Sequence, residues 1–572
     1  MINSQWHIKE INQEQVEEIE KEFSLPKSIA RIMALRGINN RKFTAHFFKP
    51  SKDNMHDPFK LKGMRSAVNR ILEQKRDGSK VLIFGDYDVD GVSSASLLYL
   101  FLKRVGIDTS YYIPHRDIDG YGVSNRGIDF AKEIGSNLII TCDCGINAFD
   151  QIEYAKTLDI DVIITDHHKP EEKIPDCVSV VNPHQKDCKY PFKGLCGVGV
   201  AFKLALAIAQ DLSLNSDIVW EYADLVTLGT AADMVPLIDE NRIISHIGLE
   251  QIRSGNNIGI RSLISTSKLN IENITIGQIG FWVTPKINAA GRLGDASRAV
   301  KLLTSVSPTY ALEFAQKLHN ENERRKTITQ SMEQESIMMV ERKLDVNSRR
   351  SIVLYKEGWN SGIVGIVASR IKEIYNRPTI IISVEDGVGK GSCRSIVNFD
   401  IVDALKSCEN LLDGFGGHPM AAGLTMNENN LDDFINSFEE ACLNELDLDD
   451  LEPKIFIDCE IDFCDINSRM INFLKCLEPF GPKNGKPSFL SRNVFVDGIP
   501  KVLGKDQSTI KFNAKQKDSL FESIGFRMID EYEKLIKGKP LDIVYNISEN
   551  HWNGKISLQL EIKGIRYSNV KA

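Results

Sequence analysis

The sequence has 572 residues, and its 42% hydrophobic content is sufficient for several domains with apolar cores. A formal net charge of −8 excludes a uniformly basic nucleic-acid-binding chain, so any surface for such a ligand must be local. No run approaches the length of a membrane span, no apolar targeting segment is visible, and the eleven cysteines form no CxxC pair. We therefore expect a soluble, cytoplasmic protein with reduced thiols and no membrane partner.

The first two predicted domains differ in their secondary structure. Residues 1–75 are expected to be helical. From residue 76 to residue 255, short β-branched runs alternate with helical segments, which is typical of an α/β domain with a parallel sheet. The predicted strands are Lys80–Phe84, Ser110–Ile113, Leu138–Thr141, Val162–Thr165 and Val178–Val181.

Three further regions follow the parallel-sheet domain. In the linking region, residues 256–345, the segment from Pro308 to about Leu344 can be one connector helix, roughly 55 Å long at ~1.5 Å per residue. Residues 346–445 are predicted to form a second α/β lobe, with strands Ser351–Tyr355 and Thr379–Val384 on either side of the helix Gly362–Asn376. In residues 453–572 apolar and polar side chains alternate, which predicts an antiparallel β domain and a small barrel.

The stretch Lys80–Ser94 carries the strongest chemical signal in the sequence. A buried strand ends at Gly85, and three aspartates follow at alternate positions: Asp86, Asp88 and Asp90. Carboxylates crowded at a strand end repel one another and lose hydration, and a polyvalent cation removes both penalties. The stretch therefore predicts a metal site.

Two other interpretations of these aspartates are possible. The spacing matches the start of an EF-hand calcium loop, but Leu97 stands where the bidentate glutamate is required, and a strand precedes the loop. A strand followed by Asp-x-Asp also suits a phosphatase with Asp86 as the nucleophile. That second interpretation stays open at this point.

The same domain places further metal ligands after later strands. Asp143 follows Leu138–Thr141, and Asp166, His167 and His168 follow Val162–Thr165, while Asp233 follows an apolar segment. Since the carboxyl ends of parallel strands meet in one crevice, we expect these side chains to converge. Five or more carboxylates and two imidazoles are enough for two divalent cations, and mixed oxygen and nitrogen ligands favour Mn²⁺, with Mg²⁺ as the alternative.

These motifs, in this order, resemble those of the DHH phosphoesterase family, and within it the RecJ branch. The resemblance extends over nearly the whole chain. It implies a DHH catalytic domain (76–255), a DHHA1 substrate-binding domain (346–445) and an OB-like domain (453–572), so that the fold class is α/β multidomain. The segments that carry it, besides the acidic motifs, are residues 113–116 (IPHR), 120–122 (GYG), 288–295 (NAAGRLGD), 390–395 (KGSCRS), 416–423 (GGHPMAAG) and 479–481 (PFG).

The resemblance also implies a role for each motif residue. One metal ion would be held by Asp88 and Asp143, and the other by a set that shares Asp143: Asp90, Asp143, His167 and Asp233. Asp86 would be a ligand or an immediate neighbour of one. His168 would contact the scissile phosphate, and Asp166 would orient the histidine pair. The implied reaction is in-line hydrolysis of a phosphodiester by a metal-activated water, without a covalent enzyme intermediate.

Basic residues and a tyrosine are expected to bind the nucleic acid. We expect Arg116, Arg292, Lys390 and Arg394 in glycine- or serine-containing turns, where they can hold phosphates. Tyr121 can stack on a base. By resemblance, Ser392 and Arg394 belong to a pocket for the 5′-terminal phosphate, and Gly416, Gly417 and His418 line the same lobe. Lys286 and Asn360-Ser361 depart from the family pattern, so the family's DNA contacts at these positions are not carried over to them.

The activity implied is that of an exonuclease that degrades single-stranded DNA from the 5′ end to mononucleotides, in DNA repair and recombination. We expect a monomer, with a helicase and a single-stranded-DNA-binding protein as candidate partners. Two alternatives stay open: a phosphodiesterase for short oligonucleotides or cyclic dinucleotides, and a non-catalytic single-strand binder or scaffold. The complete acidic set argues against the second.

Overall fold

The computed structural model describes residues 4–120, 122–293, 295–346, 348–504, 506–552 and 555–568. The chain divides into two compact units. Unit 1 comprises Met1–Asn40, Lys326–Lys475 and Lys486–Ala572, and unit 2 comprises Arg41–Arg325 and Cys476–Gly485. Among the described residues, no helix is both long enough and apolar enough to cross a membrane.

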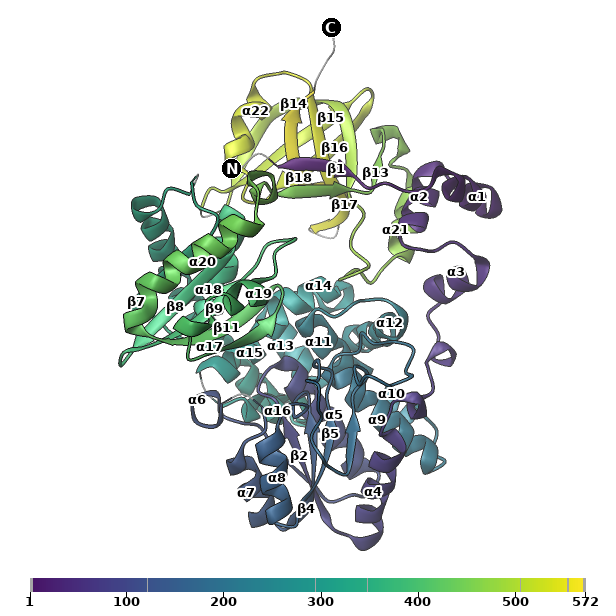
Figure 1. Ribbon diagram of the computed structural model, residues 1–572. Helices are drawn as coiled ribbons and strands as arrows, with labels where there is room; N and C mark the ends of the chain where they lie inside the picture. Colours follow the sequence, from purple (N-terminus) through teal and green to yellow (C-terminus); the bar gives the residue numbers. More distant parts are fainter. Residues whose placement is uncertain are drawn as a thin grey trace. The chain divides into compact units, whose positions relative to one another are not determined.

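Unit 2 is built around a five-stranded sheet in the order β3-β2-β4-β5-β6, in which every pairing is parallel (Figure 1). This confirms the predicted parallel α/β domain. All five predicted strands are present, with bounds that differ by a few residues. The strands are β2 (Lys80–Gly85), β3 (Thr109–Tyr112), β4 (Ser136–Cys142), β5 (Asp161–Thr165) and β6 (Ser179–Val181).

Helices cover both faces of this sheet, which explains why its strands are apolar on both sides. Alternate strand residues face two cores: Val81 and Ile83 on one side, and Leu82 and Phe84 on the other. The first core is closed by α4 (Met64–Asp77), α5 (Val89–Arg104) and α9 (Gly197–Asp211). The second is closed by α7 (Asn125–Glu133) and α8 (Phe149–Thr157).

A group of helices completes unit 2. The segment from Ile276 to Leu293 is one continuous run, in which a π-helical turn separates two α-helical parts. Asp233 is the last residue of a helix, so its expected place among the strand ends is wrong. The helices are α10 (Asp217–Trp220), α11 (Ala223–Asp233), α12 (Asp239–Ser254), α13 (Ile258–Thr266), α14 (Ile276–Gln278), the π-helical η4 (Ile279–Val283), α15 (Thr284–Leu293) and α16 (Ser297–Leu303).

The predicted connector is a single helix of 36 residues, α17 (Pro308–Lys343). It begins in unit 2 and ends in unit 1. Its apolar residues serve two cores in turn: Ala311 and Leu318 pack in unit 2, and Met332 and Val340 pack in unit 1.

Unit 1 contains a second sheet in the order β10-β11-β9-β8-β7. Only β7 (Ile352–Glu357) and β8 (Thr379–Glu385) are parallel; the remaining pairings are antiparallel. The other strands are β9 (Val388–Arg394), β10 (Gly414–His418) and β11 (Ala421–Asn427), and the flanking helices are α18 (Val364–Tyr375), α19 (Ile401–Lys406) and α20 (Leu431–Glu445). The predicted turn positions are therefore wrong for Lys390 and Arg394, which lie on β9.

A closed five-stranded barrel forms the C-terminal part of unit 1. Its strands pair in the order β14-β15-β16-β18-β17, and β17 returns to β14. This confirms the predicted β-barrel. The strands are β14 (Phe489–Leu503), β15 (Thr509–Gln516), β16 (Ser519–Gly525), β17 (Leu541–Trp552) and β18 (Lys555–Tyr567), with the short β13 (Cys459–Glu460) beside β14 and the helices α21 (Ser468–Cys476) and α22 (Tyr532–Ile536).

The N-terminal region is not wholly helical. The strand β1 (Gln5–Ile8) pairs in parallel with β12 (Lys454–Ile457) beside the barrel (Figure 1). Helices follow this strand as predicted: α1 (Gln13–Phe23), α2 (Lys27–Leu35) and α3 (Arg41–Phe48). The predicted domain 1–75 is divided, because residues up to Asn40 belong to unit 1 and those from Arg41 belong to unit 2.

Candidate metal centre

The loop after β2 is held in shape by its own side chains and backbone. Asp88 caps α5, since its Oδ1 accepts hydrogen bonds from the backbone N–H groups of Asp90 (2.8 Å) and Gly91 (3.0 Å). A Cβ at Gly91 would lie 2.5 Å from the Asp86 carbonyl oxygen, so only glycine allows this turn. Asp86 and Asp90 are almost fully buried as a result.

Asp90 is bound by the first turn of α9. The backbone N–H groups of Gly197 and Val198 donate to its two carboxylate oxygens at 2.6 and 2.9 Å. These N–H groups have no partner within the helix, and the positive end of the helix dipole favours an anion there. We did not predict this contact; the sequence signal was Gly197-x-Gly199, which is weak evidence by itself.

Close approach explains two glycines around this carboxylate. A Cβ at Gly197 would lie 2.6 Å from Asp143 Oδ1, and a Cβ at Gly229 would lie 2.6 Å from Asp90 Oδ1. Either substitution would push a side chain into the carboxylate cluster.

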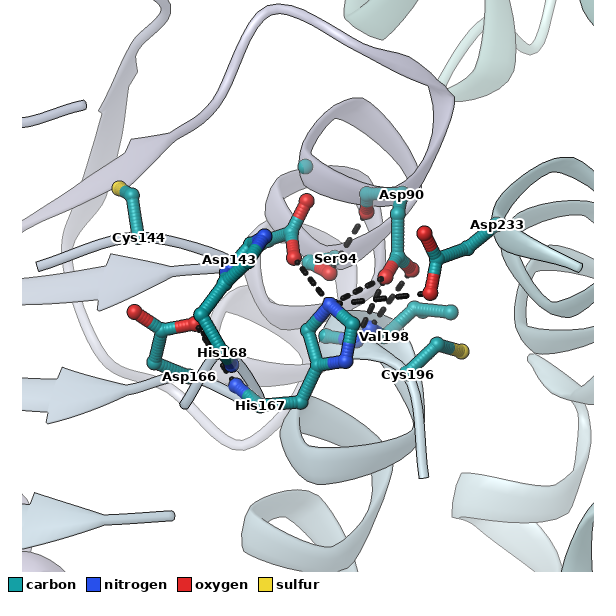
Figure 2. Close-up of polar contacts among 12 residues, drawn as sticks. Asp90, Ser94, Asp143, Cys144, Asp166, His167, His168, Cys196, Val198 and Asp233 are labelled. Atoms are coloured by element: carbon teal, nitrogen blue, oxygen red, sulfur yellow. Dashed lines mark hydrogen bonds and ion pairs between the residues drawn. The ribbon is translucent and has the colours of Figure 1, made fainter. Parts of the chain in front are cut away.

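Asp143 and His167 occupy the middle of the cluster (Figure 2). Asp143 follows β4 and is held in the left-handed region, at a φ of 63°. The Nε2 atom of His167 lies 3.1 Å from Asp143 Oδ1, 3.7 Å from Asp233 Oδ2 and 3.8 Å from Asp90 Oδ2. The imidazole is therefore surrounded by carboxylates from the loop after β4 and from α5 and α11.

The described residues form overlapping sets whose ligand atoms lie within 4.8 Å of one another. One set contains Asp86, Asp88 and Asp143, and another contains Asp90, His167 and Asp233. Through the 3.1 Å contact of Asp143 with His167, the two sets are contiguous. All six residues predicted as metal ligands are thus brought together, and their assignment to individual ions remains a prediction.

Asp166 has a different environment from the other carboxylates. Its Oδ1 accepts from the backbone N–H groups of His167 (2.7 Å) and His168 (3.0 Å) and pairs with His168 Nδ1 (2.8 Å). Its Oδ2 accepts from the Ile146 N–H at 3.0 Å. With both oxygens used in this way, Asp166 holds the backbone of both histidines and the His168 ring through Nδ1.

The pKa values reflect this difference. Burial, with the charge of Asp88, raises the pKa of Asp90 to about 7. Burial, with the charge of Asp90, raises the pKa of Asp233 to about 8 and also raises that of Asp143. For Asp166 burial acts in the same direction, but the hydrogen bond and charge of His168 lower its pKa.

The donor set fits divalent cations. Buried carboxylates with raised pKa values are short of positive charge, and Asp86 Oδ1 is buried without a hydrogen-bond partner in the described part of the chain. Carboxylate oxygens with one or two imidazole nitrogens suit Mn²⁺ and Mg²⁺ rather than a thiolate-preferring metal. Two such ions would supply a nucleophilic water and neutralise a phosphate.

Two of the predicted basic residues lie beside the metal loop. The Arg116 guanidinium lies 5.7 Å from the centre of the Tyr87 ring, and the charges of Arg116 and Arg292 both act on the Tyr87 hydroxyl. Arg292 lies in α15 and Arg116 begins the short α6 (Arg116–Asp119), so neither is in the predicted kind of turn. Tyr121 lies outside the described residues.

The helix α15 also supports the loop. Asn288 Oδ1 accepts from the Val89 N–H at 3.3 Å, and Gly291 packs so closely on the Tyr87 carbonyl that a Cβ would lie 2.6 Å away. Asn288 and Gly291 of the NAAGRLGD motif therefore have a structural role, besides the positive charge that Arg292 supplies.

The remaining predicted binding residues belong to unit 1. Arg394 donates to Ser392 Oγ (2.9 Å) and to Ser369 Oγ (3.0 Å), next to the first turn of α18 at Gly365. Burial lowers the pKa of Arg394. The exposed Lys390 lies on the same strand, and Gly416, Gly417 and His418 lie exposed on β10.

Both departures from the family pattern have structural roles. The buried Lys286 Nζ donates to the Leu263 carbonyl and to the hydroxyls of Thr266 and Ser267, at the C-terminal end of α13. Asn360 accepts from the Gly362 N–H through its side chain, just before α18.

Family models match three parts of the chain. The DHH family N-terminal domain matches residues 80–230, the DHHA1 domain residues 349–444, and the RecJ OB domain residues 457–564. These matches coincide with the parallel sheet of unit 2, the second sheet and the barrel.

Curated relatives are similar over almost the whole chain. The single-stranded-DNA-specific exonuclease RecJ of Bacillus subtilis is 37% identical over 98% of this chain and 70% of its own length. That of Salmonella typhimurium is 34% identical over 95% of this chain and 96% of its own length. The crystal structure of RecJ from Thermus thermophilus with Mn²⁺ matches with a TM-score of 0.84 at 28% identity, over 99% of this chain and 80% of that one. The chain belongs to the RecJ family of DHH-domain exonucleases.

Proposed function

We propose that this chain is a metal-dependent exonuclease that degrades single-stranded DNA from the 5′ end to mononucleotides. The observation that carries the proposal is the pair of contiguous ligand sets around Asp143 and His167. Relatives at 33–37% identity named single-stranded-DNA-specific exonucleases support the substrate class. Solved RecJ structures with Mn²⁺ and with Mg²⁺ support the use of divalent cations.

The residues divide the work of phosphodiester hydrolysis. Two Mn²⁺ ions, or Mg²⁺ in their place, would supply an activated water and neutralise the phosphate. Asp143 would contact both ions, with Asp86 and Asp88 on one side and Asp90, His167 and Asp233 on the other. His168 would donate from Nε2 to a phosphate oxygen, because Asp166 holds its Nδ1 (2.8 Å).

His168 is suited to that role by its charge state. Burial alone would lower the pKa of its imidazole, but the hydrogen bond and the charge of Asp166 raise it to about 9. In the metal-free chain this favours the protonated ring, in which both nitrogens are donors. Arg116 and Arg292, beside Tyr87, would add further positive charge for the phosphate.

The direction of degradation, from the 5′ end, would be set by residues of unit 1. Ser392, Arg394 and the first turn of α18 combine a hydroxyl, a guanidinium and a helix N-terminus, which are three groups that bind phosphate. We assign this cluster to the 5′-terminal phosphate, with Lys390, Gly416, Gly417 and His418 in the same lobe. A role in DNA repair and recombination, a cytoplasmic location, a monomeric state and a helicase and single-stranded-DNA-binding protein as partners are parts of the same proposal.

The test uses the full chain with Mn²⁺ and single strands labelled at either end, beside a blunt duplex. We expect labelled mononucleotide to be released at once from the 5′ label and only at late times from the 3′ label, with the duplex resistant. Equal attack on the duplex, or no turnover with Mn²⁺, would contradict the proposal. A phosphoenzyme formed on Asp86, with the histidines dispensable, would instead indicate an aspartyl phosphatase.

A further inference from the structure

Two adjacent aromatic side chains are exposed on unit 2 without a role in the metal centre. Phe281 is 62% exposed and Trp282 is 45% exposed. Their rings contact each other edge to face, with centroids 5.0 Å apart. Of the tryptophans whose side chains the structure describes, Trp282 is the exposed one; Trp220 and Trp359 are buried and Trp6 is half-buried.

The backbone beneath this pair is well anchored. Both residues lie on the π-helical turn η4, and the residues that bound the turn, Ile279 and Val283, are fully buried. The Thr284 hydroxyl donates to the Gly280 carbonyl at 2.9 Å. A π-helical turn is an uncommon feature that often occurs at functional sites, and here it presents two aromatic rings to solvent.

The turn lies against the helix that carries Asp233. A Cβ at Gly280 would lie 2.9 Å from the Ala231 carbonyl oxygen, two residues before Asp233 on α11. The other end of the same continuous helical run contacts the metal loop, where Asn288 accepts from the Val89 N–H. The aromatic pair is thus on the helical run that supports the metal loop, and the turn that carries it packs on α11, the helix of Asp233.

A loop that ends in a lysine is hydrogen-bonded to the backbone of the pair. The Ser267 hydroxyl donates to the Trp282 carbonyl at 3.3 Å, and Lys286 Nζ in turn donates to Ser267 Oγ at 2.6 Å. The next residue, Lys268, is exposed and has a positive φ of 57°. Exposed aromatic rings, with basic residues on the same surface, are the combination with which proteins bind single-stranded nucleic acid irrespective of sequence.

We propose that Phe281 and Trp282 form a stacking platform for unpaired bases of the substrate strand, beyond the nucleotide that is released. This rests on the proposed function, because it takes the strand held at the metal centre as the occupant of the platform. Aromatic stacking contributes about 10- to 100-fold in affinity per base and is tolerant of sequence. The platform would therefore favour long strands over dinucleotides.

The test compares substrate lengths in the full chain with Mn²⁺. In the double variant Phe281→Ala/Trp282→Ala, we expect the KM for a thymidine oligonucleotide of about 20 nucleotides to rise at least about tenfold. The kcat, and the KM for a 5′-phosphorylated dinucleotide, should stay within about twofold, because we place the platform beyond the two nucleotides that flank the scissile bond. The conservative variant Trp282→Phe, which keeps two aromatic rings, should avoid most of this rise in the KM for the long strand. Tyr310→Ala, an exposed aromatic of the same unit, is the matched control.

Each outcome distinguishes the platform from the proposed function. If the wild-type chain does not cleave the long strand, the proposed function fails. If the wild-type chain cleaves the long strand and the double variant has the same KM for it, the platform is wrong while the proposed function stands. The same conclusion follows if the KM of the double variant rises equally for the long strand and the dinucleotide. An unchanged KM with a lower melting temperature would show that the pair is a packing surface, and would also overturn the platform.

Discussion

Asp143 must adopt the backbone turn that follows β4, and it must also place its carboxylate between the two ligand sets. Its φ of 63° is uncommon for a non-glycine residue and is found most often for Asp and Asn, so a carboxylate at this position is compatible with the turn. The position could be predicted from the sequence because an aspartate after an apolar run marks a strand end. The close approach of Gly197 could not be predicted, because it depends on how α9 packs.

Substituting Gly197 tests that close approach. In Gly197→Ala the new Cβ would lie 2.6 Å from Asp143 Oδ1 and would displace the carboxylate. We expect Mn²⁺ affinity to fall about 10- to 100-fold, as for other residues that orient metal ligands. Isothermal titration with Mn²⁺ measures this.

Gly199→Ala is the matched control. Its Cβ would meet the end of the Leu195 side chain at 3.3 Å, which can move by a few tenths of an ångström. We expect nearly unchanged Mn²⁺ affinity. Equal affinities in the two variants would contradict the role that we assign to Gly197.

The parallel strands of unit 2 were predicted well from the sequence, and the strands of the second sheet, in unit 1, were predicted less well. Runs such as Lys80–Phe84 are apolar on both faces, so a buried strand is the natural interpretation. Glycine and serine residues on β9 and β10 suggested turns, whereas cross-strand pairing with β11 holds these segments extended. Asp233 was expected among the strand ends, whereas it is the last residue of α11; the short apolar run before it does not distinguish a strand from a helix.

The strand β9 and the helix α18 give a prediction for end recognition. Arg394→Ala removes the guanidinium that lies against Ser392 and the first turn of α18. We expect the preference for 5′-phosphorylated over 5′-hydroxyl strands to fall about tenfold, since a charge-assisted phosphate contact is lost. Competition between the two substrates in one reaction measures this preference.

A surface arginine of the same helix serves as the control. Arg370 pairs with Glu373 on α18, and Arg370→Ala should leave the preference unchanged. If Arg394→Ala keeps the wild-type preference, the 5′-phosphate pocket lies elsewhere.

For the whole molecule, the buried carboxylates couple stability to pH and metal. Without cations, Asp90 and Asp233 have folded-state pKa values of about 7 and about 8, whereas an unfolded aspartate titrates near 4. Between about pH 4 and about pH 8 the folded chain then binds more protons than the unfolded chain. Its free energy of unfolding therefore falls as the pH rises through this range. The raised pKa of His168, about 9, acts in the same direction at higher pH.

Thermal unfolding measures this coupling. In a chelating buffer we expect the melting temperature to fall between about pH 6 and pH 9, and with Mn²⁺ we expect the fall to disappear, because metal binding requires the deprotonated carboxylates. Asp90→Asn should flatten the profile in chelator. Parallel profiles with and without Mn²⁺ would show that these carboxylates do not bind the metal.

In the proposed function, Asp143 belongs to two metal sites at once. The most direct measurement is the number of Mn²⁺ ions bound per chain, by equilibrium dialysis, together with turnover on single-stranded DNA. We predict two ions for the wild type and loss of both, with turnover, in Asp143→Ala, while DNA binding is retained. Asp224→Asn, a buried carboxyl on α11 outside the ligand sets, should keep both ions. One ion in the wild type, or two ions with turnover in Asp143→Ala, would show that Asp143 is not shared by two metal sites.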